Sequence, residues 1–318
     1  MSWQLKALRV FLRLGVKRSL RRQRDSYSAR RSFAFGAWLN ARGRPWQSFK
    51  ADTIGPCPAL WTGPADSDGP VILYFHGGGY VTGSPRTHAP LARYLARRTE
   101  APVCLPRYRL APEHPFPAAF EDAVGAWEAL IARGHDPAQV ALGGDSAGGG
   151  LALALLAHLC ATGQAKPAAV FAFSPFTDLT LSGASLRENA RSEILLPAER
   201  LEKLRARILQ GADPSNPRIS PLFGDFTDAP PVFLQVARTE ILRDDALRMA
   251  EALRAQGVEV RCDVWGNLPH VWQFFPGWLP EARRALDQVA AFLRARIAEG
   301  GDAPPATEPR ARAGSDGP

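Results

Sequence analysis

The sequence predicts an α/β fold, in which a mostly parallel sheet carries helices on both faces. From about residue 56 onward, short apolar runs alternate with longer helical patterns, and this alternation is typical of parallel sheets. The chain has 318 residues, of which 46% are hydrophobic. A chain of this size and composition can bury one substantial core and a smaller appended piece.

The expected elements follow one another regularly along the chain. Strands are predicted at 71–75, 102–105, 140–142, 169–173, 232–236 and 258–264. The first is the continuous apolar run from Val71 to Phe75, a pattern that favours a strand buried on both faces. Helices are predicted at 86–98, 117–132, 147–161, 197–209, 243–256 and 281–298.

The N-terminal segment differs from the rest in charge. Thirteen of the 39 Lys and Arg lie in the first 50 residues, beside one acidic residue, Asp25, so this segment carries the excess positive charge. Apolar residues spaced by three and four predict a helix over 3–22, and a second helix is expected over 26–39. The apolar stripe of the first helix consists of Leu5, Leu8, Phe11, Leu12, Val16 and Leu20.

Two interpretations of this basic helix remain open. In the first, its apolar stripe packs on the body while the basic side chains face water. In the second, the segment makes weak peripheral contact with an anionic membrane. Nucleic-acid binding is not expected, because no recognised reader motif accompanies the charge.

Composition also bears on location. No stretch approaches the roughly 18–20 apolar residues that span a bilayer, and the N-terminus lacks the pattern of a secretory signal. The four cysteines are scattered without a C-x-x-C pair, which favours a reducing, cytoplasmic setting and indicates no zinc site. Residues 299–318 are rich in Gly, Pro and Ala and are expected to be a disordered tail.

The segment Gly144-Asp145-Ser146-Ala147-Gly148 carries the strongest chemical signal. A predicted strand leads into it and a predicted helix follows, which is the context that a G-x-S-x-G nucleophile elbow requires. Small flanking residues let the backbones pass closely, and the helix N-terminus favours developing negative charge. A phosphate-binding loop is the alternative, but the segment lacks the lysine of a P-loop and the spacing of a dinucleotide fingerprint. We therefore interpret Ser146 as a nucleophile.

A second glycine-rich segment, His76-Gly77-Gly78-Gly79, directly follows a predicted strand. Acyl transfer creates an oxyanion, and backbone N–H groups held ready for it accelerate the reaction by about two to three powers of ten per donor. We expect these donors to be the amides of Gly78, Gly79 and Ala147. His76 is expected to brace the loop.

Three motifs together resemble the hormone-sensitive lipase-like family of α/β-hydrolases, close to carboxylesterases and terpene lactone hydrolases. They are H-G-G-G-Y at 76–80, Y-R-L-A-P-E-H-P-F-P-A at 108–118 and G-D-S-A-G-G at 144–149. The resemblance covers about residues 56–298 and implies an α/β-hydrolase fold with a mostly parallel eight-stranded sheet. It also implies a mobile helical cap, formed by residues 1–55 and an insertion at about 184–217, over a catalytic domain at 56–298. No cofactor or metal is implied.

Members of this family place the acid and the histidine after the serine. Only His270 follows the last predicted strand, and its position matches the catalytic histidine of the family. Glu240 matches the acid, at a place where aspartate is commoner, and Asp244 is the alternative. Asp244 and Asp245 are otherwise expected to open the next helix, where acidic residues suit the dipole. Asp145 is expected to be structural.

The resemblance implies a serine carboxylesterase for esters of short to medium acyl chains. Lactone hydrolysis and lipolysis at a membrane surface are the alternatives, and the segment around Trp272 resembles that of lactone hydrolases. A receptor without activity is a further alternative, but such relatives lose the histidine, whereas this chain keeps His270. The expected partner is a small ester or lactone, and family members often form homodimers.

Overall fold

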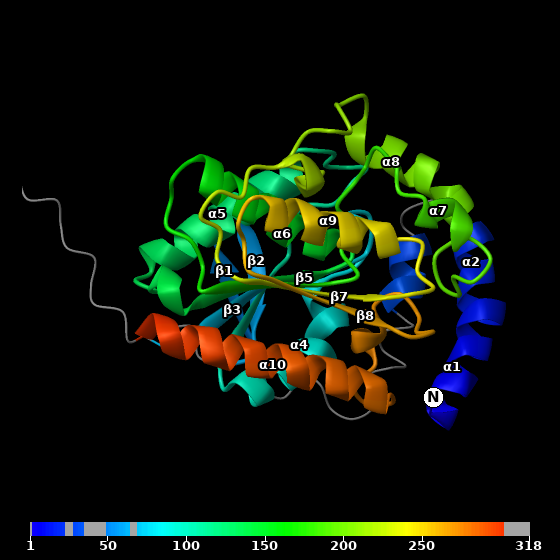
Figure 1. The fold of residues 1–318 in the computed structure, drawn as a ribbon, viewed down its shortest axis with the longest axis horizontal. Helices are drawn as coiled ribbons and strands as arrows, with labels where there is room; N and C mark the ends of the chain where they lie inside the picture. Colours follow the sequence, from blue (N-terminus) through cyan, green and yellow to red (C-terminus); the bar gives the residue numbers. More distant parts are fainter. Residues whose placement is uncertain (1, 23–27, 35–48, 64–68, 302–318) are drawn as a thin grey trace, which may run out of the picture.

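An eight-stranded sheet runs through the centre of the molecule (Figure 1). The computed structural model describes residues 2–22, 28–34, 49–63 and 69–301. The strand order is β1-β2-β4-β3-β5-β6-β7-β8; β2 is antiparallel to both of its neighbours, and all other neighbours are parallel. The strands are β1 (Lys50–Ile54), β2 (Cys57–Trp61), β3 (Val71–Phe75), β4 (Val103–Pro106), β5 (Val140–Asp145), β6 (Ala169–Phe173), β7 (Val232–Ala237) and β8 (Val260–Trp265).

Six of these strands occur where the sequence predicts them, whereas the hairpin of β1 and β2 was not predicted. Strand β1 lies at the sheet edge and is largely exposed, and β2 contains Pro58, a residue that argues against a strand paired on both sides. The sheet therefore begins at Lys50, within the range that the sequence assigns to the N-terminal segment. Gly55 forms the turn with φ 53°, and a Cβ there would lie 2.3 Å from the carbonyl oxygen of Gly125.

Helices cover both faces of the sheet (Figure 1). One face carries α5 (Ala118–Ala132), α6 (Ala147–Ala161) and α9 (Arg243–Ala255). The other carries α4 (Pro85–Thr99) and α10 (Pro280–Gly301). Helix α10 continues through 299–301, where the sequence predicts the start of a disordered tail. The rest of that tail, 302–318, lies outside the described residues.

The N-terminal helix has three consecutive parts, α1 (Trp3–Phe11), the π-helix η1 (Leu12–Val16) and α2 (Lys17–Arg22). Residues 28–34 are also helical, and the other residues of the helix expected at 26–39 are not described. Between β6 and β7 the chain forms α7 (Ser185–Glu188) and α8 (Leu201–Leu209). The short 3₁₀ turns are η2 (Pro137–Gln139), η3 (Ala198–Arg200), η4 (Pro221–Phe223) and η5 (Trp272–Phe274).

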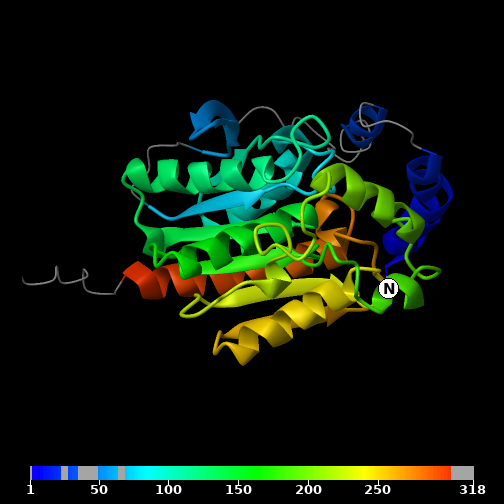
Figure 2. The same cartoon turned by 90° about the horizontal axis from the view of Figure 1, so that it is seen from above.

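The N-terminal helix packs beside the chain that connects β6 to β7, which we call the β6–β7 insertion (Figures 1 and 2). An ion pair between Arg21 and Glu199 joins the two at 2.5 Å. Across the described ranges, we find no helix with the length and apolar character needed to cross a membrane.

Candidate active site

Ser146 occupies a strained turn between β5 and α6. Strand β5 ends at Asp145 and α6 begins at Ala147, so Ser146 is the single residue between them. Its φ of 53° and ψ of −122° lie in a region that residues other than glycine rarely adopt. A Cβ at Gly148 would lie 2.1 Å from the carbonyl oxygen of Phe75. Small residues are therefore required beside the serine, as the sequence predicts.

The structure brings Ser146, His270 and Glu240 together. The Nε2 atom of His270 lies 2.9 Å from the Oγ atom of Ser146. On the other side of the ring, Nδ1 lies 2.6 Å from Oε2 of Glu240. Three residues thus form one hydrogen-bonded chain, although His270 lies 124 positions after Ser146 and 30 positions after Glu240. Such a chain can remove the proton from the serine hydroxyl group.

Glu240 is fully buried, and its other carboxylate oxygen is also satisfied. Oε1 accepts hydrogen bonds from the hydroxyl group of Ser174 at 2.8 Å and from the amide of Ala237 at 2.7 Å. These contacts fix the carboxylate at the end of β7. The alternative acid, Asp244, lies elsewhere: its carboxylate accepts from the amide of Ser185 and from Arg243.

Ser174 belongs to this site, although the sequence did not identify it. It is fully buried directly after β6, has φ 45°, and its Oγ atom also accepts a hydrogen bond from the amide of Val271 at 3.3 Å. One hydroxyl group thus joins the acid to the loop that carries His270. Its position at the carboxyl end of a central parallel strand was the available signal, because ligand and catalytic groups collect at that edge.

Burial and nearby carboxylates act in opposite directions on the pKa of His270. Burial disfavours the imidazolium and lowers the pKa. The hydrogen bond to Glu240 and the negative charges of Glu240, Glu193 and Asp145 outweigh burial, so the pKa is raised above its ordinary value of 6.5. The site therefore stabilises a positive charge on this ring.

Glu193 is a second buried carboxylate beside this pair, and it lies in the β6–β7 insertion. Its Oε1 accepts from the amides of Leu195 and Leu196, and its Oε2 accepts from the amide of Ile241, the residue after Glu240. Burial, followed by the charge of Glu240, raises the pKa of Glu193. The insertion is thereby attached to the loop that carries the candidate acid.

The N-terminal helix holds the same part of the insertion. Lys17 is buried, and its Nζ atom donates to the carbonyl oxygens of Glu193 at 2.5 Å and Ala190 at 3.3 Å. Burial lowers the pKa of Lys17. Leu12 is also buried, five positions earlier, which is the repeat of a π-helix. The π turn thus directs Lys17 toward the insertion.

The glycine loop after β3 has the conformation that an oxyanion site needs. Gly78 and Gly79 have φ of 125° and 62°, and a Cβ at Gly78 would lie 2.3 Å from the carbonyl oxygen of Thr82. The amide of Gly77 donates to Asp145 Oδ1 at 3.0 Å, which ties this loop to the nucleophile turn. Because Ala147 is the first residue of α6, its amide has no acceptor within the helix.

His76 and Asp145 are structural groups behind this loop. Burial lowers the pKa of His76 to about 3, so the ring is neutral, and it stacks on Tyr108 with ring centroids 4.3 Å apart. Asp145 accepts a hydrogen bond from Tyr74 at 2.8 Å and lies 3.3 Å from Nε2 of the buried His88. These contacts agree with the supporting roles that the sequence suggests.

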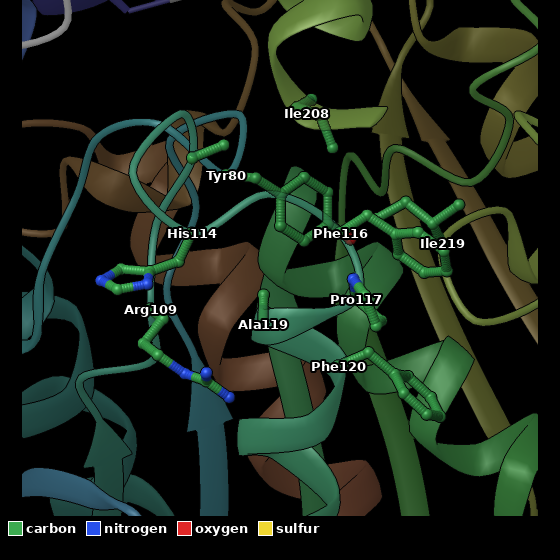
Figure 3. Close-up of a pocket in the computed structure, with 10 residues that line it drawn as sticks. Tyr80, Arg109, His114, Phe116, Pro117, Ala119, Phe120, Ile208 and Ile219 are labelled. Atoms are coloured by element: carbon green, nitrogen blue, oxygen red, sulfur yellow. The ribbon is translucent and has the colours of Figure 1, made fainter. Parts of the chain in front are cut away.

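Helix α8 covers the glycine loop. A Cβ added to Gly79 would lie 3.1 Å from Leu204, so this leucine packs directly on the loop. Next to it is a small hollow (Figure 3). Tyr80, Phe116 and Ile208 contribute to its mainly apolar lining, whereas Ser146 does not line it.

The helical residues 28–34 also contact this region. Arg30 donates from Nε to the carbonyl oxygen of Val81 at 2.9 Å and forms a two-pronged ion pair with Glu113. Glu113 belongs to the Y-R-L-A-P-E motif, and Val81 follows the glycine loop by two residues. Arg30 therefore connects the Y-R-L-A-P-E motif to the chain that follows the H-G-G-G-Y motif. Within the described ranges, no group of three or more His, Cys, Asp or Glu residues is arranged to hold a metal.

Comparisons with known proteins identify the family to which this fold belongs. A family model described as alpha/beta hydrolase fold matches residues 72–274. The chain is 44% identical to an acetyl-hydrolase of Streptomyces hygroscopicus over 78% of this chain and 83% of that protein. It is 37% identical to an esterase of Acinetobacter venetianus over 70% of this chain and 74% of the relative.

Among solved structures, an esterase from the bacterial hormone-sensitive lipase family superposes with a TM-score of 0.85 at 37% identity. The superposition covers 93% of this chain and 99% of the other.

Proposed function

This chain belongs to the hormone-sensitive lipase-like family of α/β-hydrolases and is a carboxylesterase, and we propose that Ser146, His270 and Glu240 catalyse its reaction. The observation that carries the proposal is the continuous hydrogen-bonded chain from the serine hydroxyl group to the buried carboxylate. The preferred substrates are esters of short to medium acyl chains.

His270 acts first as the general base. Its Nε2 atom takes the hydroxyl proton as Ser146 Oγ attacks the ester carbonyl carbon, and Glu240 stabilises the imidazolium through Nδ1. The ring then gives its proton to the leaving alcohol as the acyl-enzyme forms. A water molecule attacks the acyl carbon with the same ring as base, which releases the carboxylic acid and restores the serine.

The amides of Gly78, Gly79 and Ala147 are the donors for the oxyanion in this proposal. The glycine conformations and the start of α6 support it, because both leave amides unused by secondary structure near Ser146. The N-terminus of α6 adds a favourable dipole.

The hollow beside the glycine loop supports the proposed substrate class. Its aromatic and aliphatic lining, which includes Ile208 of α8, suits a small apolar group, and Leu204 of the same helix packs on the neighbouring Gly79. We assign the hollow to the acyl group. In this proposal the described helices of the N-terminal segment and the β6–β7 insertion form the cap over the site, and the side chains of α8 limit which acyl chains fit.

Turnover of p-nitrophenyl esters from acetate to palmitate tests the proposal, with Ser146→Ala as the control and a set of lactones in parallel. We expect a maximum at short or medium chains that the control abolishes. Equal turnover by both proteins would refute the role of Ser146. Faster turnover of lactones would replace the acyl-ester assignment with ring opening.

A further inference from the structure

The N-terminal helix presents a second apolar face, on the side away from the body. Leu5 and Leu12 are buried against the protein, as the amphipathic pattern predicts. In contrast, Trp3, Val10 and Leu14 are 74%, 59% and 56% exposed. Together with Phe11, which was expected in the buried stripe, they are four of the seven large hydrophobic side chains exposed in the described part of the chain. We call these four residues the outer face.

The residues of the outer face lie along one side of the helix. Trp3, Val10 and Leu14 are separated by seven and four positions, a spacing that aligns side chains on one side of a helix. Single exposed apolar residues are ordinary, but a group of four on one helix indicates a binding surface. The buried leucines already attach this helix to the body, so the outer face has no role in that packing.

Basic side chains border the outer face. Lys6 and Arg13 are exposed and lie three positions after Trp3 and Val10, and the exposed Arg18 lies four positions after Leu14. No acidic residue occurs among residues 1–24. Any surface that accepts this helix must therefore be both apolar and negatively charged.

A second copy of the chain fits this requirement poorly. Symmetric pairing of two outer faces would bring Lys6, Arg13 and Arg18 close to the same residues of the partner, where like charges repel. An anionic lipid bilayer combines an apolar interior with negative headgroups, and tryptophan is favoured at its boundary. The combination of residues thus favours a lipid surface over a second copy.

We propose that the outer face docks the protein on anionic phospholipid membranes. The helix lies in the plane of the interface, with its four apolar side chains among the upper parts of the lipid chains. Lys6, Arg13 and Arg18 contact the negatively charged headgroups. The binding is peripheral and reversible, and it is independent of the catalytic assignment.

The position of the helix relates this surface to the active site. Arg9 donates to the carbonyl oxygen of Asn267, three residues before His270, at 2.6 Å. On the next turns, Lys17 and Arg21 bind the β6–β7 insertion. A membrane held by the outer face would therefore lie beside the elements that frame the catalytic site.

Sedimentation of the full chain with phosphatidylglycerol–phosphatidylcholine vesicles tests the proposal. We expect binding that decreases with added salt and with a falling share of phosphatidylglycerol. The double variant Phe11→Ser/Leu14→Ser should bind at least about tenfold more weakly, because two inserted side chains are lost. It should retain turnover of a soluble ester, which also reports that it is folded. Phe223→Ser/Val264→Ser, at exposed apolar positions elsewhere, is the matched control and should bind like wild type.

Charge and spectroscopy give independent readouts. Arg13→Gln/Arg18→Gln should weaken binding and reduce its salt dependence, whereas Arg97→Gln/Lys203→Gln should not. Tryptophan fluorescence should shift to shorter wavelength on binding, and Trp3→Phe should remove most of that shift. Absence of wild-type binding, or equal binding by the Phe11/Leu14 variant, would overturn the proposal. A dimer in sedimentation velocity that this variant dissociates would also overturn it in favour of self-association.

Discussion

The hydroxyl group of Ser174 lies 2.8 Å from Oε1 of Glu240 and donates to it, while the same oxygen of Ser174 accepts from the amide of Val271. One side chain at the end of β6 thus connects the acid after β7 with the histidine loop after β8. We expect both contacts to help orient His270.

Replacement of Ser174 should therefore impair catalysis. In Ser174→Ala the buried Glu240 loses one donor, and an unmet buried hydrogen bond of this kind costs about 1–3 kcal/mol. We expect a fall in kcat of about tenfold or more. Ser220→Ala is the matched control, because Ser220 is equally buried but hydrogen-bonds Leu179 and Pro214 instead. A similar fall in kcat for both variants would indicate a general loss of packing.

The two candidate acids can be separated by paired substitutions. Glu240→Gln should lower kcat by about three to four powers of ten, because the amide does not stabilise the imidazolium. Asp244→Asn should retain most activity, since Asp244 contacts Ser185 and Arg243. The measurement is kcat of both variants and wild type on one p-nitrophenyl ester. The reverse ranking would assign the role to Asp244.

The pH dependence of kcat/KM follows from the raised pKa of His270. The base must be neutral, so activity should rise with pH through that pKa, with a midpoint above 6.5. Glu193→Gln removes one of the negative charges that raise the pKa, and the midpoint should move to lower pH. Glu188→Gln, on the exposed ion pair with Arg243, is the control and should leave the midpoint in place. An unmoved midpoint in Glu193→Gln would show that this carboxyl group does not act on the ring.

Substrate range should depend on Leu204. Leu204→Ala removes the side chain that packs on Gly79, and we expect the acyl-chain optimum to shift to longer esters. Lys203→Ala, the adjacent exposed position of α8, should leave the optimum unchanged. Relative kcat/KM across the ester series is the measurement. The same profile in wild type and Leu204→Ala would show that the acyl chain does not contact this leucine.

The close approach at Gly148 predicts a loss of stability. Alanine normally favours a helix over glycine by about 1 kcal/mol, but here its Cβ would lie 2.1 Å from the carbonyl oxygen of Phe75. The backbone must shift, so Gly148→Ala should cost at least about 2 kcal/mol in urea unfolding. Gly266→Ala, whose Cβ would meet no atom within 4 Å, should remain near wild type. An unchanged free energy of unfolding in Gly148→Ala would mean that β3 and α6 can move apart at little cost.

The central fold and the nucleophile turn were predictable because their signals are local. The strands β3 and β5 are apolar runs, and the G-D-S-A-G segment identifies its own turn. Chain order reduced the remaining choice to His270 and a few acids, and the structure brings Glu240 to the ring. The hairpin of β1 and β2 escaped prediction because β1 is largely exposed and Pro58 weakens the strand signal of β2.

The other site residues depend on contacts that no local pattern encodes. Ser174 and Glu193 lie on separate segments, and only the folded sheet brings both to Glu240 and Ile241. The outer face was also missed. The leucine periodicity identified the buried side of the N-terminal helix and assigned Phe11 to it, whereas Phe11 is 58% exposed.

The π turn of residues 12–16 changes the direction in which side chains point between the first and second parts of the N-terminal helix. One extra residue per turn rotates everything after Leu12 relative to what precedes it, so Lys17 faces inward while Val10 and Leu14 face outward. Deletion of the exposed Gly15 would restore a uniform helical repeat and bring the two halves into phase. Lys17 could then no longer point toward the insertion while the outer face points away from the body. Deletion of one residue, with every functional side chain kept, would therefore separate attachment to the insertion from display of the outer face.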